Sequence, residues 1–298
     1  MAKILVTGGT GLIGKHLCKL LKNRGHFVTV LSRSRTENPL SFYWNINENY
    51  IDNEAITNTD YIIHLAGAGI ADKRWTSARK KILINSRVDS TNLLFRKVKE
   101  LNPTLKGFIA ASGIGYYGSL TSEKVFSEND NSGNDFLATI CKLWEKESLS
   151  FQNENIRTVI LRTGIVLSKK GGALDKIMKP IKLGVGAAIG SGKQFMPWIS
   201  IEDLCNMYVE AIENKTINGI YNAVAPEHIT NKGFTKTIAK FVKKPLWLPN
   251  IPSFVLKIVL GELSIILLEG SRVSSRKIEN TGFKFKHSTL NSFFSQLF

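Results

Sequence analysis

Cysteine is scarce in this sequence of 298 residues. The three cysteines, Cys18, Cys141 and Cys205, are far apart and lack the close spacing of metal ligands. All three lie in apolar segments with helical spacing, so we expect buried thiols in a reducing compartment, which favours the cytoplasm. His64 and His228 also have no partners at metal-ligand spacing, so we predict no metal site.

The chain also lacks a long uninterrupted hydrophobic run. A membrane-spanning helix needs roughly 20 predominantly apolar residues, and the most apolar late segment, residues 253–270, is interrupted by Lys257, Gly261 and Glu262. We therefore predict a buried or interface helix there and no membrane partner. A strand-like segment follows Met1 directly, without the basic and then apolar pattern of a secretory leader, so export is not expected.

Acidic residues are few, because 24 aspartates and glutamates face 40 lysines and arginines, which gives a formal charge of +16. A nucleic-acid-binding surface would place basic residues in one stripe or patch among aromatic platforms. Here the basic residues are scattered through all segments, so no nucleic-acid partner is predicted. A basic surface would instead assist the binding of a phosphorylated cofactor or substrate.

Short apolar strands alternate with amphipathic helices over the first two thirds of the chain. This alternation predicts an α/β fold with a doubly wound parallel sheet covered on both faces. From about residue 226 the pattern changes to helices separated by a Pro-rich stretch. We predict a main domain over residues 1–225 and a smaller carboxy-terminal domain over residues 226–298. The expected strands are 3–8, 27–33, 60–67, 106–112 and 157–167, and the main helices are 12–25, 76–101 and 135–148.

The strongest motif is the glycine-rich "VTGGTGLIG", placed directly after the first strand and opening the first helix. Glycines in this position allow a tight turn and a close approach of the backbone to a diphosphate, while free amides at the helix start attract the anion. The motif therefore predicts a dinucleotide cofactor. The expected contacts are Gly8, Thr10, Gly11, Leu12, Ile13 and Gly14.

The end of the second strand indicates which dinucleotide is bound. An NAD site usually places an Asp or Glu there for the ribose hydroxyls, whereas this chain has Ser32, Arg33, Ser34 and Arg35. Arginine suits a ribose phosphate better, so we predict NADP, with Ser32, Arg33 and Arg35 as contacts. Glu37, close by, is the one residue that favours NAD.

Several motifs together resemble the extended short-chain dehydrogenase/reductase superfamily. They are "TGGTGLIG", "HLAG" and "SGIGYYG", and the match narrows to its atypical epimerase-type family with "SRV", "DFLA", "RTGIVLSKKGGAL", "MPWISIEDL" and "LWLPNIPSFVLKIVLGELS". The resemblance implies a Rossmann-type domain that binds NADP, and a small carboxy-terminal domain on the substrate side. It implies a small-molecule substrate, leaves a homodimer open, and adds four cofactor contacts, namely Leu65, Ala66, Gly67 and Arg87.

The catalytic pair of the superfamily is missing from this chain. Ordinary extended members carry a Tyr and, four residues later, a Lys, and here those places fall on Leu137 and Cys141. Neither can take over the proton transfer. Lys142 lies one helical step away and is expected to face solvent, and Cys141 is expected to be an inert packed thiol.

Three hydroxyls in the "SGIGYYG" loop are the remaining catalytic candidates, namely Ser112, Tyr116 and Tyr117. Arg162 and Trp198 are expected to have access to a ligand beyond the strand ends. The leading hypothesis is an atypical NADP-binding oxidoreductase or epimerase that acts on a small carbonyl or sugar-derived substrate. The alternative is a non-catalytic NADP-binding regulator or interaction protein.

Overall fold

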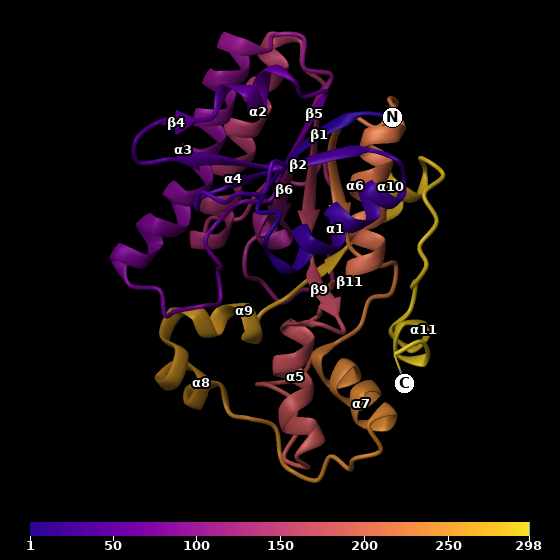
Figure 1. The fold of residues 1–298 in the computed structure, drawn as a ribbon. Helices are drawn as coiled ribbons and strands as arrows, with labels where there is room; N and C mark the ends of the chain where they lie inside the picture. Colours follow the sequence, from indigo (N-terminus) through magenta and orange to yellow (C-terminus); the bar gives the residue numbers. More distant parts are fainter. Residues whose placement is uncertain (298) are drawn as a thin grey trace.

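The centre of the protein is an eight-stranded sheet, described over residues 1–297 in a computed structural model (Figure 1). Its order is β12-β8-β6-β5-β1-β2-β3-β4, and every neighbouring pair except β3 and β4 is parallel. In that order the strands are Gly219–Ala223, Thr158–Thr163, Gly107–Gly113, Tyr61–His64, Lys3–Thr7, Phe27–Ser32, Ser41–Asn45 and Tyr50–Ile51. The predicted doubly wound parallel sheet is confirmed, with a topological switch point between β1 and β5.

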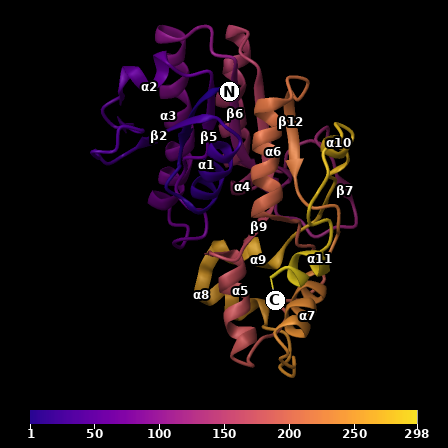
Figure 2. The same ribbon diagram turned by 45° about the vertical axis from the view of Figure 1, so that its right-hand side comes forward.

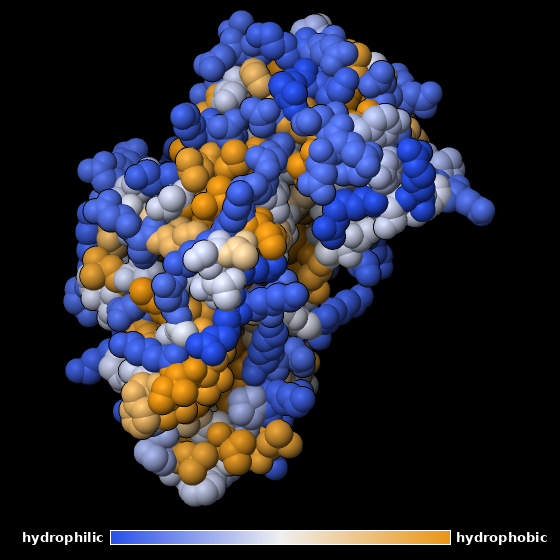
Figure 3. Space-filling model, turned by 90° about the vertical axis from the view of Figure 1, so that its left-hand side faces the viewer, coloured by the Kyte–Doolittle hydropathy of each residue, from blue (hydrophilic) through white to orange (hydrophobic). Residues whose placement is uncertain are grey.

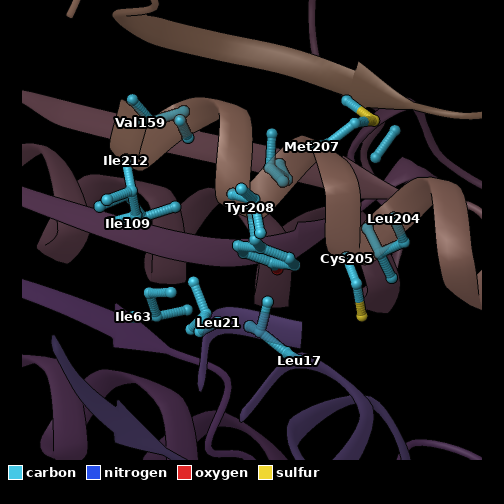
Figure 4. Close-up of a cluster of buried hydrophobic side chains, with 14 of the residues drawn as sticks. Leu17, Leu21, Ile63, Ile109, Val159, Leu204, Cys205, Met207, Tyr208 and Ile212 are labelled. Carbon is cyan, nitrogen blue, oxygen red and sulfur yellow. The ribbon is translucent and has the colours of Figure 1, made fainter. Parts of the chain in front are cut away.

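One face of the large sheet is covered by α1 (Leu12–Asn23) and α6 (Ile201–Glu213). Their apolar side chains pack on strand residues such as Ile63, Ile109 and Val159 (Figure 4). This cluster is closed to solvent, as expected for a parallel sheet whose strands are buried on both sides.

Three further helices contribute to the layer on the opposite face. In β1, Ile4 and Val6 join the α1 and α6 cluster, whereas Leu5 belongs to the opposite cluster, because successive strand residues point to opposite faces. Leu93 and Leu94 come from the long helix that we predicted over 76–101. The helices on this side are α2 (Asn53–Thr57), α3 (Ser77–Leu101) and α4 (Phe136–Leu149), and α4 is followed by η2 (Ser150–Glu154).

At Gly164, between β8 and β9, the chain passes from the large sheet into a smaller lobe. Figure 2 shows this lobe, with α5 and α7, below the large sheet. We predicted one strand over 157–167, but the chain forms β8 and then β9, which pairs with β11 in a separate sheet. A Cβ atom at Gly164 would lie 2.6 Å from the carbonyl oxygen of Pro197, so glycine permits the close passage at the crossing. The added strands are β9 (Ile165–Ser168), β10 (Gly171–Gly172) and β11 (Trp198–Ser200).

The core of the smaller lobe combines segments from both sides of the predicted boundary at residue 226. Leu174 and Met178 from α5 pack in one cluster with Phe234 and Ile238 from α7 and with Leu290. Residues from about 165 to 198 therefore share a core with the carboxy-terminal segment. The helices of this core are α5 (Ala173–Lys182), α7 (Asn231–Phe241) and α11 (Leu290–Ser295). In contrast, α10 (Arg276–Glu279) packs through Ile278 in the α1 and α6 cluster, and β13 (Arg272–Val273) pairs with β7 (Val125–Phe126).

The apolar segment 253–270 is not the single helix that we predicted. It forms α8 (Ser253–Leu260), η3 (Gly261–Ser264) and α9 (Ile265–Leu268), because the chain turns at Gly261 with a φ of 62°. Phe254 and Ile258 on α8 are 64% and 71% exposed, and a hydrophobic area is visible on this lobe in Figure 3. No helix within residues 1–297 has both the length and the apolar character needed to cross a membrane.

Candidate functional site

The glycine-rich loop forms a cradle between β1 and α1. Gly8 has a φ of 69°, and its backbone lies so close to β5 that an added Cβ would be 3.0 Å from the carbonyl carbon of Leu65. A Cβ at Gly14 would lie 2.2 Å from the Gly8 carbonyl oxygen. No side chain caps α1 at Gly11, so the first helix amides remain available to an anion. The predicted strand, turn and helix around the motif are confirmed, and this cradle fits a diphosphate.

A buried histidine links the cradle to the neighbouring strand. The hydroxyl of Thr7 accepts hydrogen bonds from the amides of Leu65 (3.2 Å) and Ala66 (3.1 Å), and therefore donates its own proton to His64 Nδ1 at 2.7 Å. His64 Nε2 then donates to Ser90 Oγ at 3.1 Å, since that hydroxyl donates to helix carbonyls. Burial lowers the pKa of His64 to about 3, which keeps the ring neutral.

Arg87 is the one predicted cofactor contact on α3. A Cβ at Gly67 would lie 3.1 Å from the Arg87 Cζ, so this guanidinium borders the loop that follows β5. It stacks over the Trp144 ring at 4.9 Å and donates to the Leu83 carbonyl at 3.0 Å. Burial lowers the pKa of Arg87, and no carboxylate within residues 1–297 pairs with it. A half-buried cation without an acidic partner is a good receptor for a phosphate.

The loop after β2 carries two arginines that have no acidic partner among residues 1–297, although Arg35 also hydrogen-bonds the Tyr50 side chain. Ser32 Oγ accepts a hydrogen bond from the Ser34 amide at 3.1 Å, which holds the turn. Arg33 is exposed, and the Arg35 Cζ lies 4.3 Å from the centroid of the Tyr43 ring. Neither arginine forms an ion pair in the described part of the chain, so both remain available to a ribose phosphate.

A buried ion pair organises the loop that follows β6. Arg162 on β8 donates from Nε and Nη2 to the two carboxylate oxygens of Glu145 on α4, at 2.9 and 2.8 Å. Ser112 Oγ donates to the same carboxylate at 2.7 Å. Burial alone lowers the pKa of the Arg162 guanidinium, but its bonds and charge pairing with Glu145 leave that pKa raised. Ser112 thus holds an inward-facing network in place.

The two tyrosines of the loop, in η1 (Ile114–Tyr117), have different surroundings. The Tyr117 hydroxyl donates to Asn222 Oδ1 at 2.6 Å and accepts from Arg162 Nη1 at 3.1 Å, and burial raises the pKa of Tyr117 to about 12. The Arg162 guanidinium stacks on the Tyr116 ring, with the Arg162 Cζ 3.3 Å from the ring centroid. The Tyr116 hydroxyl has no hydrogen-bond partner among residues 1–297, which distinguishes it from the other two candidates.

Arg162 and Trp198 do not have the ligand access that we expected. They are 1% and 0% exposed, because the network of Glu145 encloses the arginine and the core of the smaller lobe encloses the indole. Arg162 lies near the carboxyl end of β8, as expected, whereas Trp198 begins β11 of the separate three-stranded sheet, and the neighbours of both residues exclude a ligand.

The residues in place of the missing pair lie on one face of α4. Gly115 contacts both, because its added Cβ would lie 3.2 Å from Leu137 Cβ and 3.8 Å from Cys141 Sγ. Burial, followed by the nearby Glu145 carboxylate, raises the pKa of Cys141 to about 11, so the thiol stays protonated. Lys142 is exposed, as predicted. Leu137 and Cys141 therefore pack against the loop.

A pocket of about 570 Å³ lies beside this face. It is bordered by the starts of α3 and α4 on one side and by α8, η3 and α9 on the other. Its lining residues are Trp75, Lys80, Ser119, Asp135, Phe136, Leu137, Lys257, Gly261, Glu262, Ser264, Ile265, Leu268 and Glu269. The pocket thus lies between the main sheet domain and the carboxy-terminal segment, and residues from both line it.

Sequence reasoning missed the partners that hold the site together. Glu145 stands four residues after Cys141 on the buried face of a helix, and Arg162 interrupts an apolar strand. Two opposite charges in otherwise apolar, buried elements are the available signal for such a pair. The sequence gives no comparable indication that Thr7 and His64 form a hydrogen bond, because they lie on separate strands that become neighbours only in the folded sheet.

The comparisons with known proteins agree with this geometry. Residues 4–223 match the profile of the NAD dependent epimerase/dehydratase family, and residues 251–297 match a domain of unknown function, DUF1731. Epimerase family protein YfhF of Bacillus subtilis (strain 168) is 38% identical over 299 residues, which cover 99% of this chain and 97% of that protein. The chain belongs to the NAD dependent epimerase/dehydratase family and carries the additional carboxy-terminal domain.

Two solved structures have the same arrangement over nearly the whole chain. Human epimerase family protein SDR39U1 (isoform 2), crystallised with NADPH, has a TM-score of 0.89 and 33% identity, and the match covers 99% of this chain and 98% of that one. A nucleoside-diphosphate sugar epimerase from Corynebacterium glutamicum has a TM-score of 0.81 and 28% identity, covering 98% of this chain and 57% of that one. The Rossmann-type fold is thus shown by both structure and sequence.

Proposed function

We propose that this protein is an NADP-dependent oxidoreductase or epimerase that acts on a small carbonyl or sugar-derived substrate. The observation that carries the proposal is the edge formed by the glycine cradle, the two arginines after β2 and Arg87, none of which has an acidic partner among residues 1–297. The human relative crystallised with NADPH supports the choice of cofactor. NADP, when bound, supplies or accepts a hydride.

Different residues along the edge of the sheet would bind different parts of NADP. The α1 amides after Gly11 would hold the diphosphate, and Arg33 with Arg35 would hold the ribose phosphate. Arg87 would contribute a second cationic contact beside Gly67. The loop after β5, Leu65 to Gly67, would border the cofactor along the same edge.

Among the three predicted loop hydroxyls, Tyr116 fits the role of proton donor to the substrate oxygen. The Ser112 hydroxyl donates its hydrogen bond to Glu145, and the Tyr117 hydroxyl donates to Asn222. Their contribution would therefore be to hold the loop and the Arg162 guanidinium in place. The Arg162 guanidinium, stacked on the Tyr116 ring, would hold that ring in place and leave its hydroxyl free to contact a substrate. All three catalytic assignments remain predictions.

Calorimetric titration of the full chain with NADP and with NAD tests the proposal. We expect tighter NADP binding, and Arg33→Asp should weaken NADP binding by about 10- to 100-fold, the range of a lost charge-assisted hydrogen bond. Lys215→Asp is the matched control, since Lys215 is exposed beyond the opposite end of the sheet. Equal or tighter binding of NAD would contradict the assignment.

The second candidate function is a non-catalytic NADP-binding regulator. It is favoured by Leu137 and Cys141, which replace the usual catalytic pair by a packed apolar face. The two candidates differ in turnover. A protein that binds NADP but oxidises no NADPH with a broad panel of carbonyl compounds would support the regulator.

A further inference from the structure

The pocket beside α4 has mostly apolar walls. Trp75 and Phe136 meet edge to face with ring centroids 5.1 Å apart, and Leu137, Ile265 and Leu268 complete the lining. Leu137 is the residue in place of the usual tyrosine, so the substitution removes a polar group from the pocket. Walls of this kind bury apolar surface and have few groups for sugar hydroxyls.

The acidic side chains around the pocket already have partners. Glu262 pairs with Lys80, and the Glu269 carboxylate accepts the Thr121 hydroxyl at 2.5 Å. Asp135 caps α4 by accepting from the Ala138 amide at 2.9 Å and also accepts from the Ser119 amide. Glu262 is therefore neutralised by Lys80, whereas Asp135 and Glu269 keep their charge and are held in place by neutral donors.

Lys257 is different from the other charged groups of the lining. Its ammonium has no hydrogen-bond or ion-pair partner among residues 1–297, whereas Lys80 is neutralised by Glu262. The pocket therefore offers one free positive charge at its edge and an apolar interior. A ligand that complements both features has an apolar body and one negative charge.

We propose that this pocket takes an apolar carbonyl compound with a single anionic group, such as an aryl or alkyl keto acid. A nucleoside-diphosphate sugar would bring a diphosphate and several hydroxyls, which one free lysine and apolar walls cannot satisfy. The carbonyl part of this assignment rests on the proposed function. The apolar and anionic parts rest on the lining alone.

The test uses decanoate as the probe for the apolar and anionic parts, because it has an alkyl chain and one carboxylate. Full-length protein is titrated calorimetrically with decanoate and with UDP-glucose, each in the absence and presence of NADP. We expect decanoate to bind more tightly than UDP-glucose, and Lys257→Ala to weaken decanoate by about two- to fivefold, as for a solvent-exposed ion pair. Decanol should not be affected by Lys257→Ala.

Two variants place the binding in the pocket. Leu137→Asp and Ile265→Asp each introduce a charge into the lining from opposite walls, so both should abolish decanoate binding. Ile258→Asp is the matched control, because Ile258 is 71% exposed on α8 and does not line the pocket. Circular dichroism and NADP titration of each variant establish that it is folded.

Three results would overturn the proposal. They are tighter binding of UDP-glucose than of decanoate, no decanoate binding at millimolar concentration, and loss of binding in Ile258→Asp with retention in both pocket variants. Failure of NADP to bind, with decanoate binding intact, would refute the proposed function and leave the assignment of the apolar, anionic ligand standing.

Discussion

Removing one partner of the buried pair formed by Arg162 and Glu145 should strongly destabilise the fold. Glu145→Leu removes the acceptor for two guanidinium bonds and for the Ser112 hydroxyl, in a place where the two charged side chains are 2% and 5% exposed. Leaving a buried charge without its partner costs about 3–5 kcal/mol. We therefore expect the free energy of unfolding to fall by about that amount.

Urea denaturation followed by circular dichroism measures the effect. The matched control is Glu147→Leu, the same change two residues later on α4, where the carboxylate is partly exposed and accepts one long bond of 3.4 Å from Asn92. It should change stability by less than about 1 kcal/mol. Glu145→Leu combined with Arg162→Met should recover more than half of the loss, because no unpaired charge remains.

The reasoning about this pair would be refuted by a small effect. If Glu145→Leu is no more destabilising than Glu147→Leu, water or another group satisfies the Arg162 charge, and the network does not hold the loop. A double variant that is no more stable than Glu145→Leu would also contradict the reasoning, because the loss would then not come from the unpaired Arg162 charge.

The remaining predictions concern the cradle, the histidine and the loop. Below pH 6.5 an unfolded chain protonates His64, whereas the folded pKa is about 3. Stability should therefore fall with decreasing pH by about 1.4 kcal/mol per unit in this window, and His64→Asn should show a shallower slope in urea titrations at several pH values. Gly14→Ala should abolish NADP binding in calorimetry while the protein remains folded, because its Cβ would lie 2.2 Å from a carbonyl oxygen. Once a substrate is known, Cys141→Ala should retain turnover, whereas Tyr116→Phe should lower it by roughly 10²–10⁴-fold. If folded Cys141→Ala loses turnover and folded Tyr116→Phe retains it, the catalytic group lies on α4.

The sequence alone predicted the doubly wound parallel sheet and the strand, turn and helix around the glycine motif, and the structure has both. The apolar strands and the helical spacing of α3 and α4 are local patterns, and they survive in the structure as predicted. The glycine motif was equally informative, because Gly14 lies against Gly8 within the turn, although Gly8 itself also lies against Leu65 after the neighbouring strand. Apart from that contact, such features depend on neighbours within a few residues along the chain.

Only the tertiary structure decided how distant segments meet. The break of the predicted strand at Gly164 depends on the approach of Pro197, and the end of α8 at Gly261 accompanies its packing beside Arg74. The same holds for Arg162, whose partner Glu145 comes from a different element and excludes the ligand that we expected there. The pocket likewise combines residues from α3, α4 and the carboxy-terminal helices. Spacing along the sequence sets which elements form, but contacts between them depend on the order of strands in the sheet and on the packing of helices over it.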